Sequence, residues 1–281
     1  MSGASSLIES FRSAFYADDI SSQIELYNKI EQEDRGKFLE VQEFQKFLEN
    51  MEEYESCNQL LHSDKFQVVT EAEDIKIEST GSGNDFYTRS TVIIPSGVFE
   101  TLAVLYETDL LGNWVSSIRG SEVLLQPSRF RKLLRYHFSF PWPVSDRECI
   151  LEFCGIPIHD EAAVIILMKN AKGEKYLGTE LPSRREMTQL IVPMGCLYLQ
   201  ILSPQRTKVV FCVNASANIT FIPNWLCNFA SKHIMYYMMQ ALRDKIVNFK
   251  GSVYEERVTE KKDTYDYIMN MIREYLDSQG E

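Results

Sequence analysis

The sequence predicts an α+β protein: a curved antiparallel sheet wrapped around one long C-terminal helix, with helices added at both ends of the chain. Three observations predict this class. Apolar residues recur at helical spacing through residues 5–62, the pattern alternates as in strands from Phe66 onward, and a wide apolar stripe follows Pro223 for about six turns. Helices on either side of a run of strands favour one sheet with its helices segregated to a face or an end.

The first 65 residues are predicted to form an N-terminal helical extension. Phe38, Val41, Phe44 and Leu48 recur at helical spacing, with Glu and Gln between them. This pattern indicates a helical hairpin that packs on the core. A helix that binds a partner protein is the alternative.

The middle of the chain is predicted to form short strands separated by turn residues. Ser96 is expected to cap a helix over 97–114. The expected strands lie within 66–74, 75–80, 85–95, 115–126, 132–140, 147–153, 162–170, 187–202 and 207–215.

A long helix is predicted from Pro223, since proline suits the first helical position. Gly251 is expected to end it, and a further acidic helix is expected near 255–277. A sheet that curls around a single helix has a concave face to fill. With too few bulky side chains, that face becomes an apolar pocket.

Two prolines around a tryptophan, Pro141-Trp142-Pro143, interrupt two strands, because proline cannot donate to a sheet ladder. Trp142 is expected to fill core space at this corner of the sheet. Beyond the corner, Glu148 and Glu152 share one strand face, which is expected to be outward and solvated.

Charge and composition exclude several classes of function. The 281 residues carry a net charge of −11, and the acidic excess lies in the two ends, 1–65 and 254–281. A nucleic-acid binder would need a basic face, so nucleic acid is not an expected partner. No apolar run is long enough to cross a membrane and no signal pattern opens the chain. The six scattered cysteines indicate reduced thiols and a cytoplasmic location.

Motifs for catalysis or cofactor binding are missing from the sequence. No phosphate loop, dinucleotide fingerprint or G-x-S-x-G occurs, and no Cys or His pair has zinc-ligand spacing. We therefore predict no cofactor, no metal and no catalytic residue.

Two segments resemble a known family. YHFSFPWPVSDRECILEF (136–153) resembles the strand-break-strand motif of the START (steroidogenic acute regulatory protein-related lipid transfer) domains, closest to the phosphatidylcholine transfer protein type. IPNWLCNFASKHI (222–234) resembles the opening of the family's C-terminal lid helix. Residues 187–213, between them, match the place of the family's last two strands. The resemblance covers about 66–250 and implies a helix-grip fold around a lipid cavity. The acidic C-terminal helix, expected at 251–281, lies beyond it.

The sequence departs from the phosphatidylcholine type at two cavity positions. Phe153 and Gln189 stand where the family has arginines. With these cations missing, we expect no strong preference for lipids of high negative charge. Zwitterionic phospholipids, sterols and other neutral lipids become equally suitable ligands.

Ten residues are predicted to contact a lipid. Strand alternation from Phe153 and the stripe of the lid helix select Cys149, Leu151, Phe153, Met187, Gln189, Ile191, Leu226, Phe229, His233 and Tyr237.

The expected function is that of a soluble, non-enzymatic protein that holds one lipid, phospholipid or sterol-like, and exchanges it during transient membrane contact. Two alternatives stay open. One is a cyclase- or hydrolase-like enzyme that uses the same cavity. The other is a lipid-sensing module that recruits a protein partner through its terminal helices.

Overall fold

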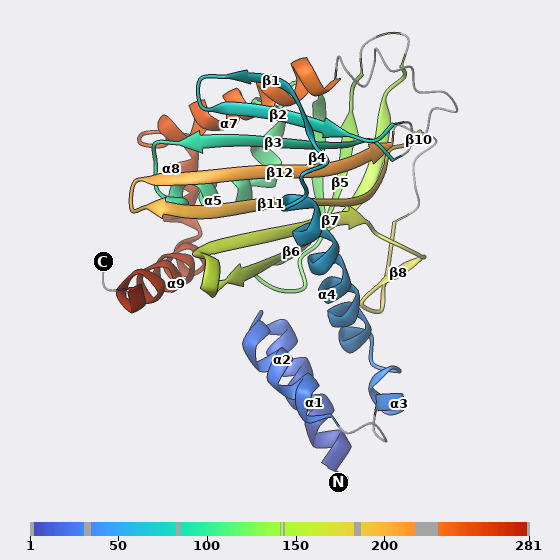
Figure 1. Cartoon of the computed structure of the whole chain (residues 1–281). Helices are drawn as coiled ribbons and strands as arrows, with labels where there is room; N and C mark the ends of the chain where they lie inside the picture. The colour runs from blue at the N-terminus through green and yellow to red at the C-terminus, as the bar shows by residue number, and fades with distance from the viewer. Residues whose placement is uncertain are drawn as a thin grey trace.

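A computed structural model describes residues 3–30, 35–82, 85–140, 142, 144–182, 187–216 and 230–279 of the chain. Figure 1 shows one large curved sheet with helices on both of its faces. This arrangement confirms the predicted α+β fold with N-terminal and C-terminal helices added.

The large sheet contains ten strands of the described chain, in the order β1-β2-β3-β12-β11-β7-β6-β5-β4, with β10 pairing in parallel to β6. The neighbours along that main path are antiparallel. Its strands are β1 (Gln67–Ala72), β2 (Ile75–Thr80), β3 (Tyr87–Ile94), β4 (Ile118–Leu125), β5 (Arg131–Phe138), β6 (Arg147–Ile158), β7 (Ala163–Asn170), β10 (Thr188–Gln189), β11 (Ile191–Ser203) and β12 (Arg206–Ser216). A separate pair is formed by β8 (Lys175–Tyr176) and β9 (Thr179–Glu180).

The helix expected over 97–114 is shorter than predicted. It is divided into α5 (Val98–Tyr106) and a 3₁₀ segment, η2 (Thr108–Asn113). Gly97 occupies the N-cap position without a side-chain hydrogen bond, so the cap expected from Ser96 is wrong. The carbonyl of Ser96 instead accepts a hydrogen bond from Thr207 Oγ1 at 3.0 Å, which ties the start of α5 to β12.

The N-terminal helices are α1 (Gly3–Tyr16), α2 (Ile20–Lys29), α3 (Arg35–Phe38) and α4 (Gln42–Leu61). Phe11, Phe44 and Phe47 form an aromatic cluster between α1 and α4, with ring centroids 5.2 and 5.5 Å from that of Phe11. Buried Cys57 of α4 packs on Cys196 and Cys212 of the sheet. The extension thus covers the outer face of the sheet, where Figure 1 shows α4 crossing the central strands.

The C-terminal region begins, among the described residues, with a π-helical turn, η4 (Ala230–Met235), that leads into α7 (Tyr236–Val247). The single acidic helix expected near 255–277 is in fact two helices, α8 (Val253–Glu260) and α9 (Lys262–Gln279). Met239 and Leu242 of α7 pack on Val92 and Val209 of the inner sheet face. The long helix therefore lies in the concavity, on the side opposite to α4.

Trp142 does not fill core space, so the prediction made for it is wrong. Its side chain is 92% exposed on the turn between β5 and β6. The adjacent Phe140 and Val144 face the interior instead. Phe140 and Val144, two positions before and after it, take the places next to the cavity, and the Trp142 side chain lies outside.

Candidate functional site

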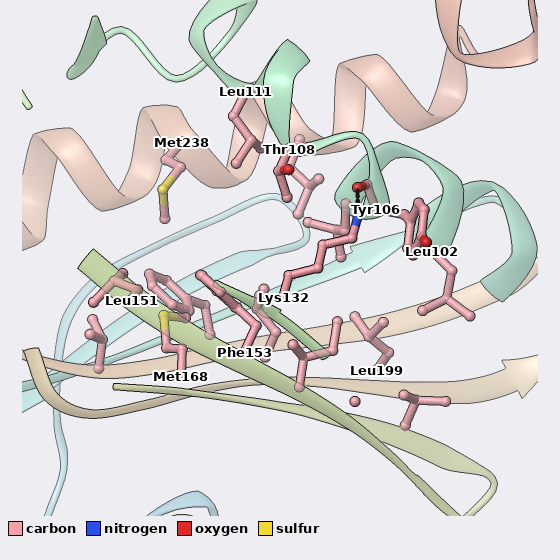
Figure 2. Close-up of a pocket in the computed structure, with 18 of the residues that line it drawn as sticks. Leu102, Tyr106, Thr108, Leu111, Lys132, Leu151, Phe153, Met168, Leu199 and Met238 are labelled. Carbon is pink, nitrogen blue, oxygen red and sulfur yellow. Dashed lines mark hydrogen bonds between the residues drawn. The ribbon is translucent and has the colours of Figure 1, made fainter. Parts of the chain in front are cut away.

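A cavity of about 450 Å³ lies between the concave face of the sheet and the helices that cover it. Figure 2 shows its side chains, which come from strands on one side and from α5, η2 and α7 on the other. Nearly all of them are aliphatic, aromatic or methionine. A cavity of this size and composition is typical of small-molecule sites, whose typical volume is about 300–1,000 Å³.

Two paired strands supply one wall by simple alternation. On β5, Lys132, Leu134, Tyr136 and Phe138 line the cavity, and on β6 the lining residues include Leu151 and Phe153. The register pairs Lys132 with Phe153 and Leu134 with Leu151, so these side chains lie next to each other on one face.

Of the three residues predicted on β6, Leu151 and Phe153 lie in the cavity wall. Cys149 shares their face of β6 by alternation but does not line the cavity, and it is buried in the cluster that contains Leu134 and Leu151. Burial raises the pKa of the Cys149 thiol to about 12, so it is a neutral, inert part of the core.

The predicted alternation of Met187, Gln189 and Ile191 has the wrong phase. Leu190 and Val192 line the cavity, whereas Ile191 is 37% exposed. Gln189 donates a hydrogen bond to the Met187 carbonyl at 3.1 Å and is not a wall residue. The alternation itself holds, since Leu190 and Val192 are in the wall and Gln189 and Ile191 are not, and the register sets its phase by pairing Gln189 with Glu148 of the outer face. The short β10 pairs with β6, and β11 begins only at Ile191.

The predicted face of the lid helix is also rotated. Leu226 and Phe229 lie outside the described residues. His233 is not in the wall, and Tyr237 is 61% exposed. The two rings stack on each other, with their centroids 6.5 Å apart. The wall is formed by Ile234, Met235, Met238, Met239 and Leu242.

The displacement by one position, from His233 to Ile234 and from Tyr237 to Met238, is the shift that a π-helical turn produces. A π turn inserts one residue into the helix, and one extra residue moves the stripe by about 100°. A stripe extrapolated at 3.6 residues per turn from Leu226 through η4 therefore arrives one position early.

Several wall residues could not be inferred from the resemblance. Ile268, Met271, Ile272 and Tyr275 of α9 line the cavity, so the helix that follows the predicted domain forms part of the site. The marked amphipathic pattern of α9 was the available signal, but it cannot say which surface the apolar face covers.

Lys132 is the deepest charged side chain among the described wall residues, with 8% of the residue exposed. Its Nζ donates to the Tyr106 carbonyl at 2.8 Å and lies 3.3 Å from the centroid of the Tyr106 ring. Burial lowers the pKa of Lys132 to about 8. The sequence did contain a signal for Lys132, because strand alternation puts it on the same face as Leu134 and Tyr136.

The wall does not contain an acid–base pair. None of its described residues is an aspartate or a glutamate, and the described part of the chain contains no cluster of metal-ligating side chains. Burial raises the pKa of Tyr136 well above its usual range, so its phenol stays neutral. The wall offers hydrogen bonds and one buried cation to a ligand.

Within the described residues, no helix is long and apolar enough to cross a membrane.

No family model matches the sequence, and no curated protein matches it. Several solved structures are similar. Human StAR-related lipid transfer protein 5 aligns with a TM-score of 0.61 at 12% identity, over 70% of this chain and 93% of that one. Human STARD10 aligns with a TM-score of 0.57 at 15% identity, over 70% and 80% of the respective chains. A fragment of the STAR-related lipid transfer protein from Xanthomonas axonopodis aligns with a TM-score of 0.54 at 21% identity, over 66% and 99%.

These similarities establish the fold class: the chain has the helix-grip fold of START-related lipid transfer domains.

Proposed function

We propose that this protein binds one lipid in the cavity and exchanges it with membranes. The observation that carries the proposal is the cavity itself, which is enclosed by the sheet, α7 and α9 and is almost entirely apolar. Burying an acyl chain or a sterol contributes about 0.8 kcal/mol per CH₂, so this wall supplies affinity without many polar contacts. The similar solved structures are named as lipid transfer proteins, which supports the same function.

Membrane contact is proposed at the β5–β6 turn. Trp142 is 92% exposed there, and Phe140 and Val144 on either side of it belong to the wall. An exposed tryptophan suits the membrane interface, since its ring is amphipathic. Contact at this turn would bring the bilayer next to the cavity.

Five described cysteines are free and buried, in keeping with a reducing compartment such as the cytoplasm. The enzymatic alternative is less favoured, because the wall residues that the structure describes include no carboxylate to work with a base. For the alternative of an interaction module, fewer surfaces remain that could bind a protein partner. The apolar faces of α4 and α9 are used within the molecule, which leaves their acidic outer faces for a partner.

The test is native mass spectrometry of the full chain, followed by transfer of labelled lipids between vesicles. We expect one lipid bound per chain, and transfer that depends on protein concentration. An empty cavity together with no transfer from any lipid class would overturn the proposal. Turnover of a ligand would favour the enzyme, and a stoichiometric protein partner would favour the interaction module.

A further inference from the structure

Lys132 is the starting point. Its ammonium group can donate three hydrogen bonds, and the described residues give it one acceptor, the Tyr106 carbonyl at the C-terminal end of α5. The Tyr106 ring covers another side of the ammonium. Figure 2 shows the Lys132 side chain extending along the cavity to reach this carbonyl.

The carboxylates near Lys132 are engaged elsewhere. Within the described residues, none lies close enough to form an ion pair with it, and Glu107 and Asp109 act on it only over a longer range. Glu107 accepts hydrogen bonds from Lys261 and Tyr265, each at 2.6 Å, and Asp109 is paired with Arg257 at 3.0 Å. A buried cation without an ion-pair partner is costly, and an anionic ligand would offset that cost.

We propose that the cavity takes a lipid with an ionised carboxylate, such as a long-chain fatty acid, and that Lys132 binds the carboxylate while the apolar wall holds the chain. This inference rests on the proposed lipid-binding function and specifies the ligand class. Burial lowers the pKa of Lys132 to about 8, so the ammonium is still the major form at pH 7 and supplies the positive charge.

The balance of charge favours a carboxylate over a phosphate. One lysine neutralises one carboxylate, whereas a phosphate monoester carries roughly −1.5 to −2 charges at pH 7 and would leave charge uncompensated in an apolar site. Arg129 also lies in the wall, but its guanidinium is over the Tyr267 ring at 4.0 Å and it is partly exposed.

This proposal adds a preference for a singly charged lipid to the expectation of no strong preference for phospholipids of high negative charge. That expectation depended on Phe153 and Gln189, where the family has arginines. Lys132, paired across the sheet with Phe153, supplies a cation from the neighbouring strand.

The experiment measures dissociation constants of the full chain for three probes of equal chain length: palmitate, methyl palmitate and a lysophosphatidate with a palmitoyl chain. Wild type is compared with Lys132→Met and with Lys175→Met. Lys175 is exposed on β8, so Lys175→Met controls for net charge alone. We expect wild type and Lys175→Met to bind palmitate roughly tenfold more tightly than the ester, the effect of one charge-assisted hydrogen bond. Lys132→Met should lose this difference and still bind the ester.

Each other outcome is decisive. Equal binding of palmitate and its ester by wild type would overturn the carboxylate proposal and leave lipid binding intact. Tighter binding of lysophosphatidate than of palmitate would overturn it in favour of a two-cation phosphate site. A palmitate preference that survives in Lys132→Met would remove Lys132 from the site. Failure to bind any of the probes or any other lipid would overturn the proposed function itself.

Discussion

Two buried lysines on opposite faces of the sheet have opposite electrostatic environments. Lys169 on the outer face and Lys132 on the inner face are 7% and 8% exposed. Burial works to lower the pKa of Lys169, but the carboxylates of Glu53, Glu152 and Glu49 outweigh it and raise the pKa. Among the described residues no carboxylate forms an ion pair with Lys132, and burial outweighs the more distant Glu107 and Asp109 and lowers its pKa.

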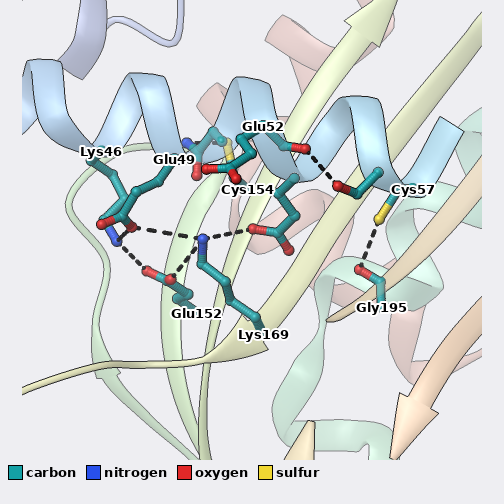
Figure 3. A network of polar contacts seen from close by, with 11 residues as sticks. Lys46, Glu49, Glu52, Cys57, Glu152, Cys154, Lys169 and Gly195 are labelled. Atoms are coloured by element: carbon teal, nitrogen blue, oxygen red, sulfur yellow. Dashed lines mark hydrogen bonds and ion pairs between the residues drawn. The ribbon is translucent and has the colours of Figure 1, made fainter. Parts of the chain in front are cut away.

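The outer face holds its charges because α4 supplies their partners (Figure 3). Lys169 Nζ lies 2.9 Å from Glu53 and 3.6 Å from Glu152, while Lys46 Nζ lies 2.9 Å from Glu152 and 2.7 Å from Glu49. The inner face borders a cavity, and no described carboxylate lies within ion-pair distance of its one deep cation, which has only the carbonyl and ring of Tyr106 as near partners. The comparison shows that the buried lysine on the outer face stabilises the fold through ion pairs. The buried lysine on the inner face has no such pair and is available to a ligand.

The largest change in stability is expected when the ion pairs of the outer face are broken. Lys169→Met leaves Glu53 without its ion pair and Glu152 with only Lys46, and removing one member of a buried ionic cluster destabilises by about 3–5 kcal/mol. Lys132→Met removes an unpaired charge and should leave the stability of the ligand-free protein equal or higher. Denaturant unfolding of the delipidated proteins measures both. A similar loss in the two variants would contradict the comparison.

The second prediction concerns how the stability of wild type and of Lys132→Met depends on pH. Between pH 8 and 10.5, folded Lys132 has released a proton that the unfolded chain still holds, so this residue makes folding more favourable as pH rises. Relative to Lys132→Met, wild type should gain about 3 kcal/mol over this window.

Other groups titrate there too, and only the difference between the two proteins is diagnostic. The raised pKa of buried Tyr136 works in the opposite direction in both, because the unfolded phenol ionises first. Glu107, Asp109 and Lys261, which act on Lys132, are present in both proteins. A stability difference that stays constant with pH would show that Lys132 is not strongly desolvated.

A third prediction tests the requirement for an apolar inner face. Met238→Glu places a carboxylate in the cavity wall, and Tyr237→Glu places one on the exposed face of the same helix. We expect Met238→Glu to weaken lipid binding at least tenfold, since an unpaired carboxylate would face the chain, and Tyr237→Glu to bind normally. Equal loss in both variants would show that the face of α7 has been assigned incorrectly.

The smallest effect on stability is expected outside both faces. Trp142→Ala should change the free energy of unfolding by no more than about 0.5 kcal/mol, because the side chain is 92% exposed. If the turn contacts membranes, the same variant should slow lipid transfer between vesicles without weakening lipid binding in solution. A variant that is destabilised yet transfers lipid normally would place Trp142 in the core after all.

Part of the site could be predicted from the sequence because strand alternation is local. The position of Phe153 on one face of β6 follows from the two-residue period, and Lys132 follows from the same period on β5. The helix stripe is displaced by one position at the π turn, and the strand pattern failed because the register of β10, which no local period gives, reverses the expected phase. A period predicts a face only while the element stays regular.

The sequence by itself determined the order of helices and strands, the α+β class and an apolar concave face, because these follow from short-range periodicity and composition. The tertiary structure decided which surfaces those faces meet. Glu148 and Glu152 were expected to be solvated, but they are 0% and 6% exposed, as α4 and neighbouring side chains cover them. Likewise, only the tertiary structure shows that α9 packs on the cavity and that Lys132 lies beyond ion-pair distance of every described carboxylate. These two facts distinguish a lysine available to a ligand from one that is paired in the core. Burial and pairing depend on residues far apart in the chain, and no local pattern encodes them.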